Sequence, residues 1–204
     1  MFETIYAKNV ISKDILDYCI KDYYSRDSYS DPIMNKTSPG NSLPMLHAIC
    51  EQVFGRKLVY ITGNFYKHTQ PYLPHTDYKT YLGNSINVVI PLTYTDSAPS
   101  LVIFDQTWEQ DSVTWCMDHP VHYFEFNTGV KGCPYEYPVK NLTGKYISQE
   151  LYQYINHYKH ESLFGLSGVA YSFEPGNIIV FDNRKIHCTS KFTGEKLGLS
   201  LRFK

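Results

Sequence analysis

Glu174-Pro-Gly-Asn-Ile-Ile-Val-Phe-Asp182, near the end of the chain, is the stretch from which the fold can be inferred most directly. Its Pro-Gly pair predicts a turn, and the β-branched and aromatic run that follows predicts a buried strand. The run ends five residues before His187. Far upstream, Pro74-His-Thr-Asp77 carries a histidine and an aspartate two positions apart. Residues i and i+2 of an extended strand point to the same side, so both of these side chains can reach one ion.

His75, Asp77 and His187 therefore form a candidate metal triad. Two histidines and one carboxylate can occupy one face of a metal and leave the opposite face open, the arrangement that non-haem Fe(II) oxygenases prefer. A bare His-x-Asp pair also occurs by chance, and the alternative is a surface loop after Pro74. The ligand interpretation depends on the strands predicted around the pair, which are short and rich in β-branched residues: 85–93, 100–105 and 178–182.

Together these segments resemble the Fe(II)- and 2-oxoglutarate-dependent dioxygenase family. The resemblance rests on Tyr66, nine residues before His75, on the ligand strand, and on the segment that leads to His187. It covers roughly residues 58–204. It implies a mainly β fold with flanking helices, a double-stranded β-helix (a jelly-roll, cupin-like barrel) with the metal site at its open end.

The same resemblance implies the chemistry. Fe(II) would be held by His75, Asp77 and His187, with 2-oxoglutarate as co-substrate and O₂ as oxidant. A substrate would be hydroxylated, or oxidised in a related way, with release of succinate and CO₂. The alternative is a cupin-like barrel that binds a metal or small ligand without oxygenase turnover, and a third reading is a catalytically idle interaction domain. The substrate is not indicated: amino acid, peptide, nucleobase and small metabolite all remain open.

The last predicted strand alternates between two kinds of residue, which places Leu197, Leu199, Leu201 and Phe203 on one face and Lys196, Gly198, Ser200 and Arg202 on the other. The apolar face is expected to pack against helices. The polar face fits either a plain surface strand or an inward wall that supplies the counter-charge for a small anion.

The family resemblance favours the inward wall. Family members hold the distal carboxylate of 2-oxoglutarate with a lysine or arginine nine to fifteen residues after the second histidine, which implies Lys196 (nine) or Arg202 (fifteen). We favour Lys196, with Arg202 as assistant or substitute, since arginine can grip a carboxylate with two parallel bonds. Gly198 departs from the small hydroxyl residue that is usual there. Tyr66 is the third candidate contact to the co-substrate.

Composition sets the class of protein. The chain has 204 residues, 43% hydrophobic and 19% charged, with a mean hydropathy of −0.34, which predicts one domain over residues 1–204. The formal charge of −1 provides no general attraction to nucleic acid, although it does not exclude a local basic patch. Apolar runs reach only four residues, so no membrane span is expected. The five cysteines form no Cys-x-x-Cys pair, which predicts reduced thiols and a cytoplasmic location.

Three helices are predicted from N-cap serines and apolar periodicity: 12–24, 42–54 and 148–158. Residues 25–40 are expected to be a loop, and residues 1–57 a helical N-terminal support. Between residues 106 and 164 the strand rhythm ends, which predicts an insertion that covers the barrel mouth and contacts substrate through aromatics such as Trp115 and Tyr123. Asn87, on the strand after the ligand pair, fits an inward and an edge position equally well.

One further cluster lies in this insertion. Cys116, His119 and His122 are spaced superficially like zinc ligands, but a structural zinc site needs a fourth ligand and only Cys133 is near. Packing within the insertion or contact with substrate is the favoured interpretation.

Overall fold

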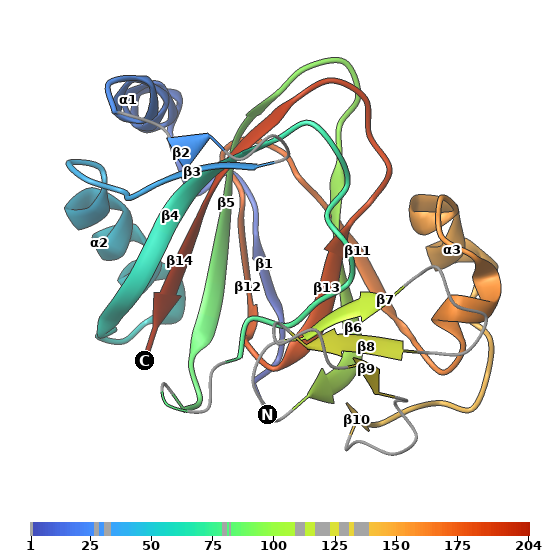
Figure 1. Ribbon diagram of the computed structural model, residues 1–204. Coiled ribbons are helices and arrows are strands. Elements are labelled where there is room, and N and C mark those ends of the chain that lie inside the picture. Colours follow the sequence, from blue (N-terminus) through green and yellow to red (C-terminus); the bar gives the residue numbers. More distant parts are fainter. Residues whose placement is uncertain are drawn as a thin grey trace.

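The computed structural model describes residues 2–26, 29–30, 34–78, 81, 83–108, 113–116, 123–126, 131–132 and 139–204. Its two main sheets face each other, and their inner faces share a buried cluster to which Tyr66 and Val89 contribute from one sheet and Leu101 and Ile103 from the other. Helices α1 (Lys13–Tyr24) and α2 (Leu43–Phe54) lie outside the larger sheet, and α3 (Gln149–Ile155) lies beside the smaller one (Figure 1).

The larger sheet is antiparallel with the order β1-β12-β5-β14-β4-β3-β2. The bounds of these strands are β1 Ile5–Ala7, β2 Tyr29–Ser30, β3 Met34–Thr37, β4 Tyr60–His68, β5 Ile86–Tyr94, β12 Ile178–Asp182 and β14 Lys196–Phe203. β5 and β12 are buried along nearly their whole length because helices cover one face and the second sheet covers the other. This explains why both strands are apolar without alternation.

The smaller sheet has the order β10-β6-β11, and β13 pairs with the opposite edge of β6. The bounds are β6 Ser100–Trp108, β10 Val139–Lys140, β11 Gly168–Ser172 and β13 Lys185–Thr189. His75 and His187 form an isolated antiparallel bridge on the far side of β13. Along the chain the strands cross repeatedly between the two sheets, as in the double-stranded β-helix predicted from the sequence.

A third sheet lies within the predicted insertion, formed by β7 (Val113–Cys116), β8 (Tyr123–Phe126) and β9 (Lys131–Gly132). Its side chains are outside the described residues, as are the side chains of the cluster Cys116, His119, His122 and Cys133 and of the expected substrate contacts Trp115 and Tyr123. The described end of the insertion packs as core: Leu151 and Ile155 of α3 and Leu163 of the short helix η2 (His160–Leu163) contact the outer face of β6. That the remainder covers the barrel mouth stays a prediction.

The period-2 prediction for the last strand is confirmed. Leu197 and Leu199 of β14 pack in one cluster with Leu16 of α1 and Leu46 of α2. The opposite face of β14 therefore points toward the second sheet, and the surface-strand alternative is wrong.

The expected loop over residues 25–40 is wrong in part, because β2 and β3 extend the larger sheet from the edge of β4. An open edge offers unpaired backbone groups, so a polar segment can pair there without a hydrophobic pattern. β1 was not foreseen either. Ser148 caps α3 as predicted, with its hydroxyl accepting from the backbone N–H of Leu151 at 3.3 Å, but the helix ends at Ile155 instead of residue 158.

Within the described part of the chain, no helix combines the length and the apolar character that a membrane crossing requires.

Candidate metal centre

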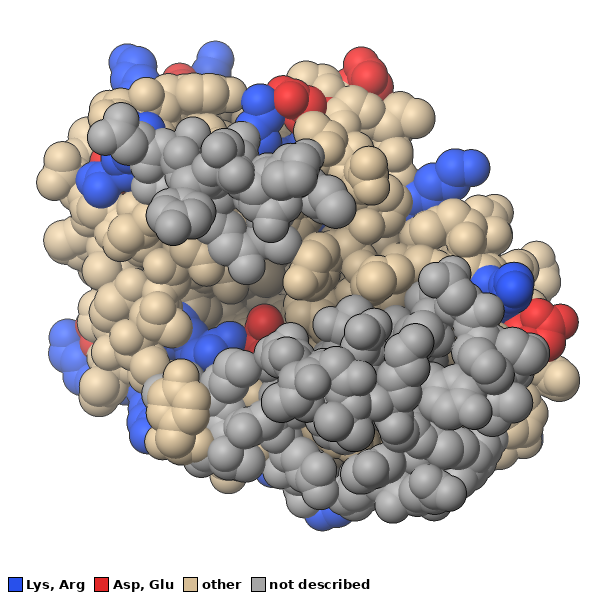
Figure 2. Space-filling model, viewed as in Figure 1, with Lys and Arg blue, Asp and Glu red and all other residues tan. Residues whose placement is uncertain are grey.

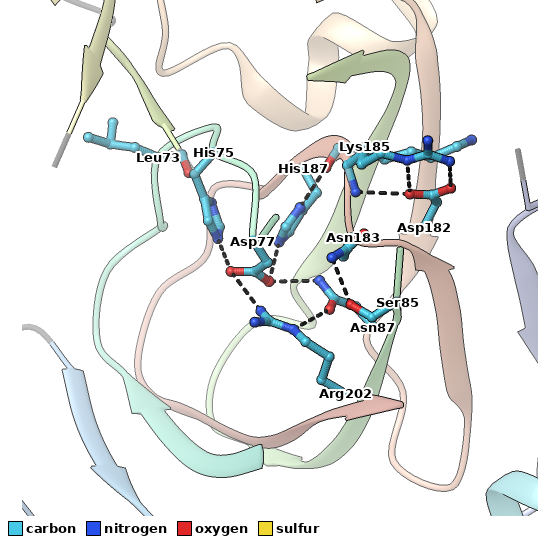
Figure 3. A network of polar contacts seen from close by, with 11 residues as sticks. Leu73, His75, Asp77, Ser85, Asn87, Asp182, Asn183, Lys185, His187 and Arg202 are labelled. Carbon is cyan, nitrogen blue, oxygen red and sulfur yellow. Dashed lines mark hydrogen bonds and ion pairs between the residues drawn. The ribbon is translucent and has the colours of Figure 1, made fainter. Parts of the chain in front are cut away.

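His75, Asp77 and His187 come together in the structure and line one cavity. One potential ligand atom from each lies within 4.8 Å of the others. The Nε2 atom of His75 is 3.8 Å from Oδ1 of Asp77, and the Nε2 atom of His187 is 3.4 Å from Oδ2. In Figure 3 both imidazoles point toward the carboxylate, His187 from β13 and His75 from the segment that precedes β5. The predicted triad is therefore a spatial cluster, although His187 lies 110 residues after Asp77 in the sequence.

Backbone pairing holds the two ligand segments at this separation. His75 and His187 exchange backbone hydrogen bonds of 2.9 Å in both directions. The backbone N–H of Asp77 donates to the carbonyl of Asn183 at 3.3 Å, in the turn between β12 and β13. The side chain of Asn183 in turn donates to the Ser85 hydroxyl at 2.7 Å, which ties that turn to the start of β5. His75 and Asp77 thus lie on a segment outside the named strands, which one isolated bridge ties to β13 and one backbone bond ties to the β12–β13 turn; the strand predicted to carry this pair is reduced to that bridge.

Both histidines present the same ring nitrogen to the cluster. Nδ1 of His75 lies 2.8 Å from the carbonyl of Leu73, and Nδ1 of His187 lies 3.1 Å from the carbonyl of Lys185. A carbonyl only accepts, so Nδ1 must carry the proton in each ring. When the imidazole is protonated, Nε2–H faces Asp77; when it is neutral, Nε2 carries the lone pair, which is the arrangement that metal-binding histidines adopt.

The carboxylate is held in its ionised form. Burial by itself would raise the pKa of Asp77, but the hydrogen-bonding imidazole of His187 and the charges of His187, His75 and Arg202 outweigh it and hold the pKa well below its ordinary value. The Asn87 side chain donates to Oδ2 at 2.8 Å. An anionic oxygen and two imidazole lone pairs that converge on one point are a donor set suited to a divalent transition metal.

The triad opens into a cavity of about 150 Å³ between the two sheets. The predicted co-substrate residues Lys196, Arg202 and Tyr66 all line it. Figure 2 shows this face of the molecule hollowed, with basic and acidic side chains side by side in the hollow. Elsewhere on this face, the basic and acidic side chains of the described residues are scattered and form no large basic or acidic area.

Lys196 is a buried cation. Only 3% of its surface is exposed, and its Nζ donates to the Thr189 hydroxyl at 2.8 Å. The rings of Phe173, Phe192 and Tyr66 surround Nζ at 4.9, 5.6 and 5.7 Å. Burial lowers the pKa of Lys196 to about 7. No carboxylate among the described residues pairs with this ammonium group, so the site suits an incoming anion.

Gly198 has a steric reason to be glycine. A Cβ at this position would lie 2.5 Å from the hydroxyl oxygen of Tyr66 and 2.9 Å from Cζ of Phe173. The tyrosine therefore occupies the space that a serine side chain would need. Its hydroxyl, whose pKa is raised by burial and by Asp77, stays protonated and can donate a hydrogen bond.

Arg202 lies at the metal end of the same strand face, six residues from Lys196. Its Nε donates to Oδ1 of Asn87 at 3.2 Å, and one terminal nitrogen is 3.7 Å from Oδ1 of Asp77. The sequence left the position of Asn87 open. The structure places it inward and buried, between Arg202 and the carboxylate (Figure 3). No sequence signal distinguished it from an edge residue.

Comparison with known proteins agrees with this architecture. No family model matches the chain, and no curated protein shows significant sequence similarity. Among solved structures, the non-haem α-ketoglutarate-dependent epimerase SnoN from nogalamycin biosynthesis superimposes with a TM-score of 0.57 at 9% identity, over 98% of this chain and 77% of that chain. HygX from Streptomyces hygroscopicus, with nickel, 2-oxoglutarate and hygromycin B bound, gives 0.54 at 11% identity, over 98% and 82%.

A Pseudomonas putida prolyl-4-hydroxylase gives a TM-score of 0.52 at 10% identity, over 98% of this chain and 91% of that chain. At these identities the comparisons show the fold. The chain has the jelly-roll fold of the Fe- and 2-oxoglutarate-dependent enzymes, and the resemblance seen in the sequence is confirmed at that level.

Proposed function

We propose that the protein is an Fe(II)- and 2-oxoglutarate-dependent oxygenase. It hydroxylates a substrate and converts 2-oxoglutarate to succinate and CO₂. The observation that carries the proposal is that the His75, Asp77 and His187 cluster and the buried ammonium group of Lys196 line one cavity. The triad offers ligands to a divalent metal. The ammonium group of Lys196 offers a counter-charge to the distant carboxylate of a dicarboxylate that binds this metal.

Each residue then has a definite task. His75, Asp77 and His187 would hold the iron from one side, and their bonds to backbone carbonyls and to Asn87 keep them oriented. Lys196 would bind the distal carboxylate of 2-oxoglutarate, with a hydrogen bond from Tyr66.

Arg202 stands next to the triad and so is better placed near the metal-binding end of the co-substrate than near its distal end. When bound, Fe(II) supplies the centre at which 2-oxoglutarate and O₂ react. The protein's share is to orient the reactants and limit the access of water.

The class of substrate is proposed only broadly. HygX is solved with hygromycin B, and a similar Trichoplax adhaerens prolyl hydroxylase with a peptide of hypoxia inducible factor. We propose a small molecule or a peptide side chain for this chain too. We also propose a cytoplasmic location, which is supported by the free, buried thiols of Cys19, Cys50 and Cys188.

Metal and co-substrate binding can be tested without knowing the substrate. Purified protein should bind one Fe(II), replaceable by Mn(II) or Co(II), and should convert 2-oxoglutarate to succinate slowly even without substrate. His75→Ala and His187→Ala should lose the metal, because two protein contacts remain. His157→Ala, outside the cavity, is the matched control. Full metal stoichiometry in both ligand variants would reject the site. Metal binding without succinate in the wild type would favour the alternative, a cupin-like binding barrel.

A further inference from the structure

The buried amide of Asn87 joins two charged groups that lie at the metal centre. Its Nδ2 donates to Oδ2 of Asp77 at 2.8 Å, and its Oδ1 accepts from Nε of Arg202 at 3.2 Å. The orientation of the amide is dictated by its neighbours, because a carboxylate only accepts and a guanidinium only donates. Only 1% of the Asn87 surface is exposed, so water cannot readily replace either bond.

This bridge changes how Arg202 meets Asp77. Guanidinium and carboxylate groups commonly pair through two parallel hydrogen bonds. Here Nε is engaged by Asn87, and the nearest terminal nitrogen is 3.7 Å from Oδ1 of Asp77, beyond the usual hydrogen-bond length of about 2.7–3.2 Å. The ion pair is therefore held apart, although both partners are close and only partly exposed.

The separation between Arg202 and Asp77 matters because a metal ion would bind the same carboxylate. If the carboxylate binds a metal, a guanidinium gripping both of its oxygens would compete with the cation for the same negative charge. Removing Asn87 would leave Oδ2 without this donor and Nε without this acceptor, and both could be satisfied at once if Arg202 closed onto Asp77.

We infer that Asn87 is a positioning residue that keeps Arg202 from competing with the metal for Asp77. This inference rests on the proposed metal site. In this role Asn87 holds the carboxylate in place and keeps the guanidinium at a distance at which its charge is present but its hydrogen bonds are directed elsewhere.

A double-mutant cycle on metal affinity tests the inference. Metal-free protein is titrated with Mn(II), and the free ion is followed by its electron paramagnetic resonance signal. The proteins are wild type, Asn87→Ala, Arg202→Gln and the double variant. Asn87→Ala should weaken Mn(II) binding by about 10- to 100-fold. Arg202→Gln should bind at least as tightly as wild type. In the Arg202→Gln background, the Asn87→Ala change should cost much less, because the competitor is gone.

Asn177→Ala is the matched control. This buried asparagine also bridges two partners, accepting from the backbone N–H of Asn9 and donating to the Tyr6 hydroxyl, but away from the triad. Its Mn(II) affinity should equal that of wild type. Circular dichroism verifies folding, and Asn87→Ser, which retains a small polar group too short to span both partners, replaces Asn87→Ala if the latter does not fold.

Three results would overturn the inference. An unchanged affinity in folded Asn87→Ala or Asn87→Ser denies the residue any positioning role. An equal loss in both Arg202 backgrounds shows that Asn87 acts on Asp77 alone. A marked loss in Arg202→Gln by itself shows that the arginine supports the metal. If the wild type binds no Mn(II) at all, the proposed function fails instead, so the two failures are distinguishable.

Discussion

Replacing Lys196 by methionine should stabilise the protein that contains neither metal nor 2-oxoglutarate, while abolishing the binding of 2-oxoglutarate. Methionine is unbranched and of similar length, so it can fill the same space without a charge. The buried ammonium group is costly because neither water nor a carboxylate among the described residues solvates it. The site is therefore expected to trade stability for the binding of an anion.

The magnitude follows from the pKa of Lys196. Burial lowers this pKa from the ordinary 10.5 to about 7. At 1.36 kcal/mol per pKa unit, the buried ammonium group therefore lowers the free energy of unfolding by roughly 4–5 kcal/mol. The variant loses the hydrogen bond to Thr189, worth about 1 kcal/mol, and the contacts with three aromatic rings. The free energy of unfolding of Lys196→Met should therefore exceed that of the wild type by about 1–3 kcal/mol at pH 7, which corresponds to an increase in Tm on the order of 3–9 °C.

The pH dependence of this gain identifies its cause. Because the pKa of Lys196 is lower in the folded state, the unfolded chain binds more protons between about pH 7 and 10, so the wild type gains stability as pH rises through this window. The methionine variant has no titrating group at position 196, so it lacks this pH-dependent contribution to stability. Its advantage in urea unfolding, followed by circular dichroism, should therefore be larger at pH 7 than at pH 9 by about 2 kcal/mol.

Lys191→Met, at an exposed position, is the control and should show no such difference. With Mn(II) present, 2-oxoglutarate should raise the Tm of the wild type and not that of Lys196→Met. A Lys196→Met protein that is less stable at both pH values, or whose advantage does not change between pH 7 and 9, would refute the reasoning.

Three further predictions concern the same cavity. The affinity for 2-oxoglutarate should fall by about tenfold per pH unit above pH 7, because the free protein must first protonate Lys196, while Lys196→Arg removes this contribution; isothermal titration at several pH values compares them. Gly198→Ser should weaken 2-oxoglutarate binding and cost about 1–3 kcal/mol of stability, since its Cβ would meet the buried Tyr66; a variant as stable and as competent as wild type contradicts the steric argument. Cys188, which is buried and has a raised pKa, should resist iodoacetamide in the folded protein and react in urea, as mass spectrometry of the modified peptides can establish.

Features with a short sequence period were predictable from the sequence. The apolar and polar faces of residues 196–203 follow from the alternation of side chains along a strand, and this alternation alone placed Lys196 and Arg202 on one wall. His75 and Asp77 also converge, but they lie outside the named strands, so strand alternation does not explain their convergence. The jelly-roll fold was inferred from these strands together with the family resemblance. Such strands can be recognised because the residue types along a strand reflect which of its faces are buried.

Only the tertiary structure decided which distant residues meet. β2 and β3 join the sheet through backbone groups, which every residue carries, so their polar sequence gave no strand pattern. Asn87 and Arg202 face each other because β5 and β14 pair in a register that places these two residues opposite one another. A shift of one residue would turn either side chain to the other face, and that register depends on the packing of both sheets and their helices, which no local stretch of sequence contains.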